Sequence, residues 1–225
     1  MNYHIDTGLI YEKFLENACC PLCAIKSIVE EQVIHEFLND AVMEDNTHIE
    51  VVKKGFCAHH FDMMFNRPNK LSLAIQARSN LPTVESLLAP AKNKGGAKKL
   101  ADKIDGAINE CIVCDYVEKS MVKYYKTIAQ MFLYEKEFYK YLIKCKGFCM
   151  EHYAQLLRYS GYASIGTKDY LKTLSDTQKR AFSLLDNNLE TFCRKHDYRN
   201  ANMPLGSAEN ALPDTRDIFY GKKND

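Results

Sequence analysis

Residues 20–43 read CPLCAIKSIVEEQVIHEFLNDAVM, and residues 55–60 read GFCAHH. Between the two cysteine motifs, apolar residues recur at three- and four-residue spacing from Ile25 to Val42. This spacing places apolar side chains on one face of a helix, so we predict a helix over 24–43. A Cys-x2-Cys pair, a long helix and a Cys-x2-His pair therefore form one unit of the predicted fold.

The same unit occurs a second time in the chain. Residues 111–114 (CIVC) repeat residues 20–23 (CPLC) at an offset of 91 positions, and residues 147–152 (GFCMEH) repeat residues 55–60 at an offset of 92. Two motifs that keep their register to within one residue over about 90 positions indicate an internal duplication.

The other long segments also show helical periodicity, and none shows the alternation typical of strands. The predicted helices are 71–89, 98–110, 116–143 and 167–192, with turns expected at 44–47 and 134–136. We expect residues 44–56 to return partly extended toward Cys57. The fold class predicted from these patterns is all-α.

The stretch 90–99, PAKNKGGAKK, is basic, contains two glycines and lacks a periodic pattern, which is typical of a linker. We therefore predict four regions, with the two repeats packed as one globular unit. These are a first helical repeat over 1–89, a linker over 90–99, a second helical repeat over 100–199 and an irregular C-terminal strap over 200–225 with one short helix begun by Ser207.

The duplicated cysteine and histidine pairs have the spacing of metal ligands. Zn²⁺ takes Cys sulfur and His nitrogen in tetrahedral geometry, and two such pairs supply four ligands. The candidate ligands are Cys20, Cys23, Cys57, His60, Cys111, Cys114, Cys149 and His152. His60 is preferred to His59, because the position that matches His59 in the second repeat is Glu151. The sequence thus predicts two Zn²⁺ ions.

Two pairings of these ligands are compatible with the spacing. We expect each ion to take all four ligands from one repeat, so that Cys20 and Cys23 join Cys57 and His60. The alternative combines the cysteine pair of one repeat with the Cys-x2-His pair of the other. In either pairing four protein ligands leave no open coordination position, which favours a structural role for the metal.

A third, partial echo of the motif lies near the end of the second repeat. Residues 193–198 (CRKHDY) resemble 111–116 (CIVCDY), with His in place of the second cysteine. The candidate additional site consists of Cys193, His196, Asp197, Tyr198 and Arg199. It is either a thiol or half-metal site, around which an enzyme could be built, or a helix end with a capping histidine and an Arg–Asp pair.

Charge and composition restrict the function further. The formal net charge is +1, which gives no general attraction to nucleic acid. No secretory signal and no apolar run of membrane-spanning length is present. We therefore expect a cytoplasmic location, away from the membrane, where nine cysteines stay reduced and indicate metal or redox chemistry.

These observations favour an interaction or regulatory module with structural zinc, acting on a protein partner or a small ligand. The alternative is a thiol or iron–sulfur sensor of redox state or metal, with Cys19, Cys145 and Cys193 as additional thiols. Known catalytic motifs are missing from the sequence, which favours a protein that is not an enzyme.

The motifs CPLC…GFCAHHF and CIVC…GFCMEHY, followed by FCRKHDYRN at 192–200 and MPLGSAENALP at 203–213, resemble an uncharacterised bacterial domain-of-unknown-function family. The resemblance extends over essentially the whole chain. It implies no established activity, and it supports only the metal-ligand positions already named.

Overall fold

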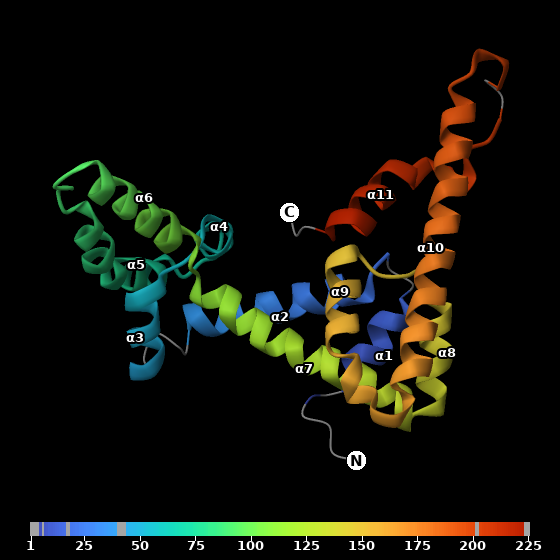
Figure 1. Cartoon of the computed structure of the whole chain (residues 1–225), viewed down its shortest axis with the longest axis horizontal. Coiled ribbons are helices and arrows are strands. Elements are labelled where there is room, and N and C mark those ends of the chain that lie inside the picture. Colours follow the sequence, from blue (N-terminus) through green and yellow to red (C-terminus); the bar gives the residue numbers. More distant parts are fainter. Residues whose placement is uncertain (1–4, 6, 17–18, 40–43, 201–202, 223–225) are drawn as a thin grey trace. The chain divides into compact units, whose positions relative to one another are not determined.

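The computed structural model describes residues 5, 7–16, 19–39, 44–200 and 203–222 (Figure 1). Within these residues the chain forms eleven α-helices and no strand, so the predicted all-α class is confirmed. The helices are α1 (Gly8–Leu15), α2 (Pro21–Leu38), α3 (Asp45–Lys54), α4 (Ala58–Phe65), α5 (Lys70–Glu85), α6 (Lys94–Asn109), α7 (Ile112–Tyr134), α8 (Lys136–Lys144), α9 (Met150–Arg158), α10 (Thr167–Lys195) and α11 (Ala211–Tyr220). Short 3-10 segments are η2 (Ser86–Leu88), η3 (Ser160–Gly166), η4 (Tyr198–Asn200) and η5 (Gly206–Asn210).

The chain divides into two compact units. Unit 1 comprises Met1–Ser27 and Met121–Asp225, and unit 2 comprises Ile28–Ser120. The chain enters unit 2 within α2 and leaves it within α7. The units therefore do not coincide with the halves 1–89 and 100–199 that the repeat suggested.

Residues 94–99 of the expected linker form the start of α6 instead. The helix begins there because the side chain of Asn93 accepts a hydrogen bond from the backbone N–H of Gly96 at 2.8 Å, which satisfies one of the free donors of the first turn. In the C-terminal strap, η5 and α11 make residues 206–220 helical rather than irregular. Residues 201–202 and 223–225 of the strap lie outside the described residues.

The return segments are helical as well, which corrects the expectation of an extended chain over 44–56. Glu44 and Glu135 have extended backbones and mark the predicted turns, but α3 and α8 begin directly after them. The outgoing helix α2 ends at Leu38, and the last four residues of the predicted helix 24–43 lie outside the described residues.

Unit 1 is built around α10. Its buried side chains recur every three or four residues, as expected for one face of a long helix; they are Tyr170, Leu174, Thr177, Gln178, Ala181 and Leu185. This helix contacts α8, α11 and η3, and α11 in turn contacts α9 (Figure 1). Phe14 of α1 packs edge-on against Phe138 of α8, with ring centroids 5.2 Å apart.

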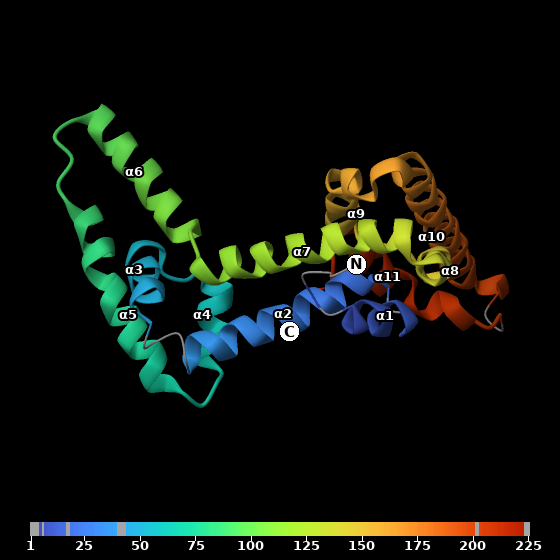
Figure 2. The same ribbon diagram turned by 90° about the horizontal axis from the view of Figure 1, so that it is seen from below.

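Unit 2 has its core where the second half of α2 meets α5 and α7. Phe37 packs edge-on against Tyr116, with ring centroids 5.3 Å apart, and Gln76 of α5 donates to the carbonyl of Phe37 at 2.7 Å. α3 packs along α5, as Figure 2 also shows.

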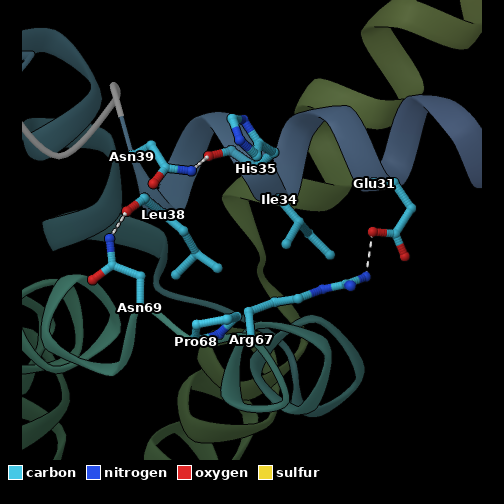
Figure 3. Close-up of a pocket in the computed structure, with 8 residues that line it drawn as sticks. All are labelled: Glu31, Ile34, His35, Leu38, Asn39, Arg67, Pro68 and Asn69. Atoms are coloured by element: carbon cyan, nitrogen blue, oxygen red, sulfur yellow. Dashed lines mark hydrogen bonds and ion pairs between the residues drawn. The ribbon is translucent and has the colours of Figure 1, made fainter.

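The turn between α4 and α5 is also attached to α2 (Figure 3). The Asn69 side chain donates to the carbonyl of Leu38 at 2.6 Å, and Arg67 pairs with Glu31. These contacts hold α4 against α2.

Candidate metal centres

Centre 1 consists of Cys20, Cys23, Cys149 and His152, all in unit 1. Cys20 precedes α2 and Cys23 lies in its first turn; Cys149 caps α9 and His152 lies in its first turn. The Nδ1 atom of His152 is 3.6, 3.4 and 3.1 Å from the sulfurs of Cys20, Cys23 and Cys149. The sulfurs of Cys23 and Cys149 are 3.6 Å apart.

Centre 2 consists of Cys57, His60, Cys111 and Cys114, all in unit 2. Cys57 and His60 lie at the start of α4, and Cys111 and Cys114 at the start of α7. The Nδ1 atom of His60 is 3.3 Å from each of the three sulfurs. The sulfurs of Cys57 and Cys114 are 3.9 Å apart.

These distances are close to the edges of a zinc tetrahedron. With Zn–S of about 2.3 Å and Zn–N of about 2.1 Å, tetrahedral angles place two sulfurs about 3.8 Å apart and a sulfur and a nitrogen about 3.6 Å apart. A disulfide would need about 2.05 Å between sulfurs, and all nine cysteines are free. Each quartet therefore has the donors and the dimensions to hold one metal ion.

Each centre combines ligands from both repeats. The expectation that each ion takes its four ligands from one repeat is wrong, and the alternative pairing is the one observed. Helix lengths explain this: at about 1.5 Å per residue, α2 advances roughly 27 Å from its cysteine pair, whereas the returning α3 covers only about 15 Å. The Gly-Phe-Cys loop instead meets the start of α7, where the N–H of Ile112 donates to the carbonyl of Gly55 at 3.1 Å.

Glycine and an amide side chain shape each Gly-Phe-Cys loop. Gly147 has φ of +107°, and a Cβ there would lie 2.5 Å from the Cβ of Ala181. The side chain of Gln178 on α10 accepts from the N–H of Phe148 at 3.0 Å and donates to its carbonyl at 2.8 Å. The backbone immediately before Cys149 is thus fixed by α10.

In unit 2, Gly55 corresponds to Gly147, and the amide of Asn80 has the role of the Gln178 amide. Gly55 has φ of +61°, and a Cβ there would lie 2.8 Å from the Asn80 side chain. Asn80 on α5 donates to the carbonyls of Val51 and Val52 at 3.2 and 3.0 Å. Both loops therefore depend on a glycine and on an amide from a neighbouring helix.

The centres differ in their exposure to solvent. In centre 1, Cys149 and His152 are 0 and 1 % exposed. Residues 221–222 lie against this centre: a Cβ at Gly221 would lie 3.5 Å from the Cys149 sulfur and 3.6 Å from that of Cys23, and the N–H of Lys222 donates to Cys23. In centre 2, Cys114 is exposed.

The second ring nitrogens of the two histidines also differ in their surroundings. His60 Nε2 lies 2.9 Å from the carboxylate of Glu30, which also lies 3.3 Å from His59 Nε2. His152 Nε2 is buried and has no hydrogen-bond partner among the described residues. Glu30 was not among the predicted site residues. Its place between Val29 and Val33, on the face of the helix that points to the core, could have indicated it, because a charged residue is unusual there.

Without metal, each centre stabilises one thiolate. Hydrogen bonds from Cys149 and then Cys20 lower the pKa of Cys23 to about 4, and a hydrogen bond from Cys114 lowers the pKa of Cys111 to about 3 despite burial. Burial opposes protonation of His60, yet hydrogen bonds with Cys111 and Glu30 raise its pKa to about 10. A metal ion that binds at centre 2 must therefore displace a proton from the His60 imidazole as well as protons from thiols.

The candidate additional site lies at the exposed end of α10. Cys193 is exposed, Tyr198 is 87 % exposed, and Arg199 forms an ion pair with Asp197 at the surface. His196 Nδ1 lies 2.9 Å from the carbonyl of Phe192 and caps the helix end. Of the two alternatives for this segment, these contacts agree with a helix end that has a capping histidine and a surface Arg–Asp pair.

The remaining two thiols belong to unit 1. Cys145 is 3 % exposed and donates to the carbonyl of Leu142 at 3.1 Å, and burial raises its pKa to about 11. Cys19 is half-buried, and burial raises its pKa to about 12. Neither is an activated nucleophile, because nucleophilic cysteines have lowered pKa values.

None of the described helices has the length and apolar character that a membrane span requires. No curated protein and no solved structure matches the chain. One family model does match, over residues 1–225, and it is described as a family of unknown function. With this match over its whole length, the chain belongs to the family of unknown function DUF6062.

Proposed function

We propose that the protein binds two Zn²⁺ ions, one in each unit, and that these ions hold its helices together as structural metals. The observation that carries the proposal is the convergence of two Cys₃His quartets with the edge lengths of a zinc tetrahedron. Each quartet uses four protein donors and so leaves no coordination position for substrate or water.

Charge supports a role other than nucleic-acid binding. Counted from neutral cysteines and histidines, each filled centre holds +2 from zinc and −3 from three thiolates, a net change of −1. The formal charge of +1 thus becomes −1 when both centres are filled (+1 − 2). A protein of this charge has no general electrostatic attraction to phosphate backbones.

Metal analysis with paired substitutions tests both the ions and their pairing. The wild-type protein, purified without oxygen or chelator, is expected to contain two zinc ions per chain. Cys23→Ser/Cys149→Ser removes two ligands of centre 1 and should leave one zinc, whereas Cys23→Ser/Cys57→Ser damages both centres and should leave none. Pairing within repeats requires the reverse result, and a metal-free wild type would contradict the proposal.

Beyond the metal, we propose a role in binding a protein partner. Unit 2 supports this role, because apolar side chains on α5, η2 and α6 remain exposed; they are Leu71, Ile75, Leu81, Val84, Leu88 and Ile108. Large exposed apolar patches mark sites of protein–protein interaction, and these six side chains are our candidates for such a site. Replacing Leu88 and Ile108 by Ser should abolish capture of the partner while zinc content stays at two. Unchanged capture would contradict this role.

A redox sensor is the second candidate, and the exposed Cys114 favours it. A metal at centre 2 would hold Cys114 as its thiolate, and in this reaction that thiolate attacks a peroxide, the O–O bond breaks, and a sulfenic acid and hydroxide form. The Cys57 thiolate, 3.9 Å away, then displaces the second hydroxide and forms a disulfide. Two electrons pass from the two sulfurs to the peroxide, and zinc loses two ligands.

Peroxide treatment of the zinc-loaded protein distinguishes the two functions. A sensor should release one zinc ion, with a Cys57–Cys114 disulfide found by mass spectrometry, while centre 1 keeps its metal. If both ions stay bound at peroxide levels that oxidise a free exposed thiol such as Cys193, the sensor function is contradicted and only the structural role of the metal remains.

A further inference from the structure

Glu30 places a carboxylate inside unit 2. Its side chain is 8 % exposed and lies 2.9 Å from His60 Nε2 and 3.3 Å from His59 Nε2. A buried carboxylate is unfavourable unless hydrogen-bond donors or opposite charge compensate for the lost water. The two histidines are such partners, and one of them is a ligand of centre 2.

The ring of His60 is held from both sides. Its Nδ1 faces the three sulfurs at equal distances of 3.3 Å, and its Nε2 faces Glu30. In centre 1 the corresponding distances from His152 Nδ1 spread from 3.1 to 3.6 Å, and no partner for Nε2 exists among the described residues. The more regular quartet is the one whose histidine has a carboxylate behind it.

The second repeat has no carboxylate at the position that matches Glu30. The position that matches Glu30 at the offset of 91 residues is Met121, an apolar residue that is 0 % exposed. A methionine cannot accept a strong hydrogen bond from an imidazole. Glu30 therefore belongs to centre 2 specifically.

Other contacts attach α4, which carries His60, to α2, which carries Glu30. They are the Asn69–Leu38 hydrogen bond and the Arg67–Glu31 ion pair at the turn after α4 (Figure 3). These contacts do not use Glu30. Substitution of Glu30 should thus leave the two helices in place and change only the support of the His60 ring.

We propose that Glu30 is the positioning residue of centre 2, which accepts the Nε2–H of His60, keeps Nδ1 directed at the metal and strengthens zinc binding there. The inference rests on the proposed function, since it requires a metal at centre 2. Carboxylates behind metal-binding histidines fix the ring and raise its basicity as a ligand. His59 donates to the same carboxylate from the surface and helps to hold it.

Two variants of the full-length, zinc-loaded protein test this role. Glu30→Met introduces the residue of the equivalent position and removes the acceptor, whereas Glu30→Gln keeps an acceptor oxygen. In competition with a chelator, one of the two zinc ions should bind about 10–100-fold more weakly in Glu30→Met, and Glu30→Gln should recover most of the loss. Met121→Leu in unit 1 is the matched control and should leave both affinities unchanged.

A spectroscopic signal reports on the hydrogen bond itself. In the Co²⁺-loaded protein, the Nε2–H proton of His60 should give a paramagnetically shifted NMR signal that exchanges slowly with water. The signal should persist in Glu30→Gln and disappear in Glu30→Met.

Unchanged zinc affinity in Glu30→Met, with the helix content of the wild type, would overturn the inference. Equal weakening of both zinc ions together with lost helix content would assign Glu30 to general packing and overturn it too. A wild type without zinc would overturn the proposed function as well, and the metal content of the wild type, measured first, separates that outcome from the others.

Discussion

Centre 1 and centre 2 have the same ligand types on the same kinds of element, but different surroundings. Centre 1 is buried beneath Gly221 and Lys222 at the end of α11, and its histidine has no second partner among the described residues. Centre 2 has the exposed Cys114 and a histidine supported by Glu30. The two copies thus share ligand types and spacing, but only centre 1 is covered by residues 221–222 and, in the part of the chain that the structure describes, only centre 2 has a carboxylate behind its histidine.

The largest expected effect separates the two units by their metal. Cys149→Ser should unfold unit 1 and Cys57→Ser unit 2, because structural zinc contributes apparent binding energies of about 10–16 kcal/mol in small peptides. Hydrogen exchange followed by mass spectrometry should show lost protection confined to the unit that carries each substitution. Loss of protection in both units after either change would show that the centres are not independent.

The next comparison concerns the two loop glycines. Gly147→Ala should destabilise unit 1 by about 2–4 kcal/mol, because the new Cβ would overlap Ala181 and the positive φ disfavours alanine. Gly55→Ala should cost less, about 1–3 kcal/mol, since the Asn80 side chain that it meets can move. Urea unfolding of the two variants measures the difference. Equal losses would mean that backbone strain outweighs the contact with Ala181.

A pH dependence should distinguish unit 1 from unit 2. Burial raises the pKa of Cys145 from 9.0 to about 11, so its contribution to stability is complete below pH 9 and is lost as the pH rises toward 11. The loss from this thiol should reach about 2 kcal/mol, and Cys145→Ala should remove that part while the part due to Cys19 remains. The equivalent position of the first repeat, 92 residues earlier, is Lys53, so Cys145 has no counterpart in unit 2. Thermal unfolding between pH 8 and 11 tests this.

The smallest effect is expected at the cover of centre 1. Gly221 has φ of +80° and ψ of 155°, a conformation nearly restricted to glycine, so Gly221→Ala adds about 1–3 kcal/mol of local strain. The segment after α11 can relieve this strain by lifting Lys222 off Cys23. We expect nearly unchanged stability but faster transfer of the centre 1 zinc to a chelator. A rate equal to that of the wild type would show that the segment does not shield the metal.

Much of the fold could be read from the chain. The spacing of apolar residues predicted α2, α5, α7 and α10, because one side of each helix must be buried. The turns before α3 and α8 were also predicted. The helix predicted over 98–110 begins earlier, at Lys94, so most of the expected linker is helical, because Asn93 caps the first turn. A local side-chain cap thus prevailed over a composition that is typical of flexible segments.

The amino-acid sequence by itself determined the duplication, the eight candidate ligands and the all-α class, since each follows from residue type and spacing along the chain. Only the tertiary structure decided how the ligands pair, because that depends on helix lengths: α3 is too short to return along α2, so the loop before Cys57 meets the start of α7. It also decided that Glu30 lies behind His60 and Gly221 over Cys149. These neighbours are far apart in sequence, and no periodicity or motif connects them.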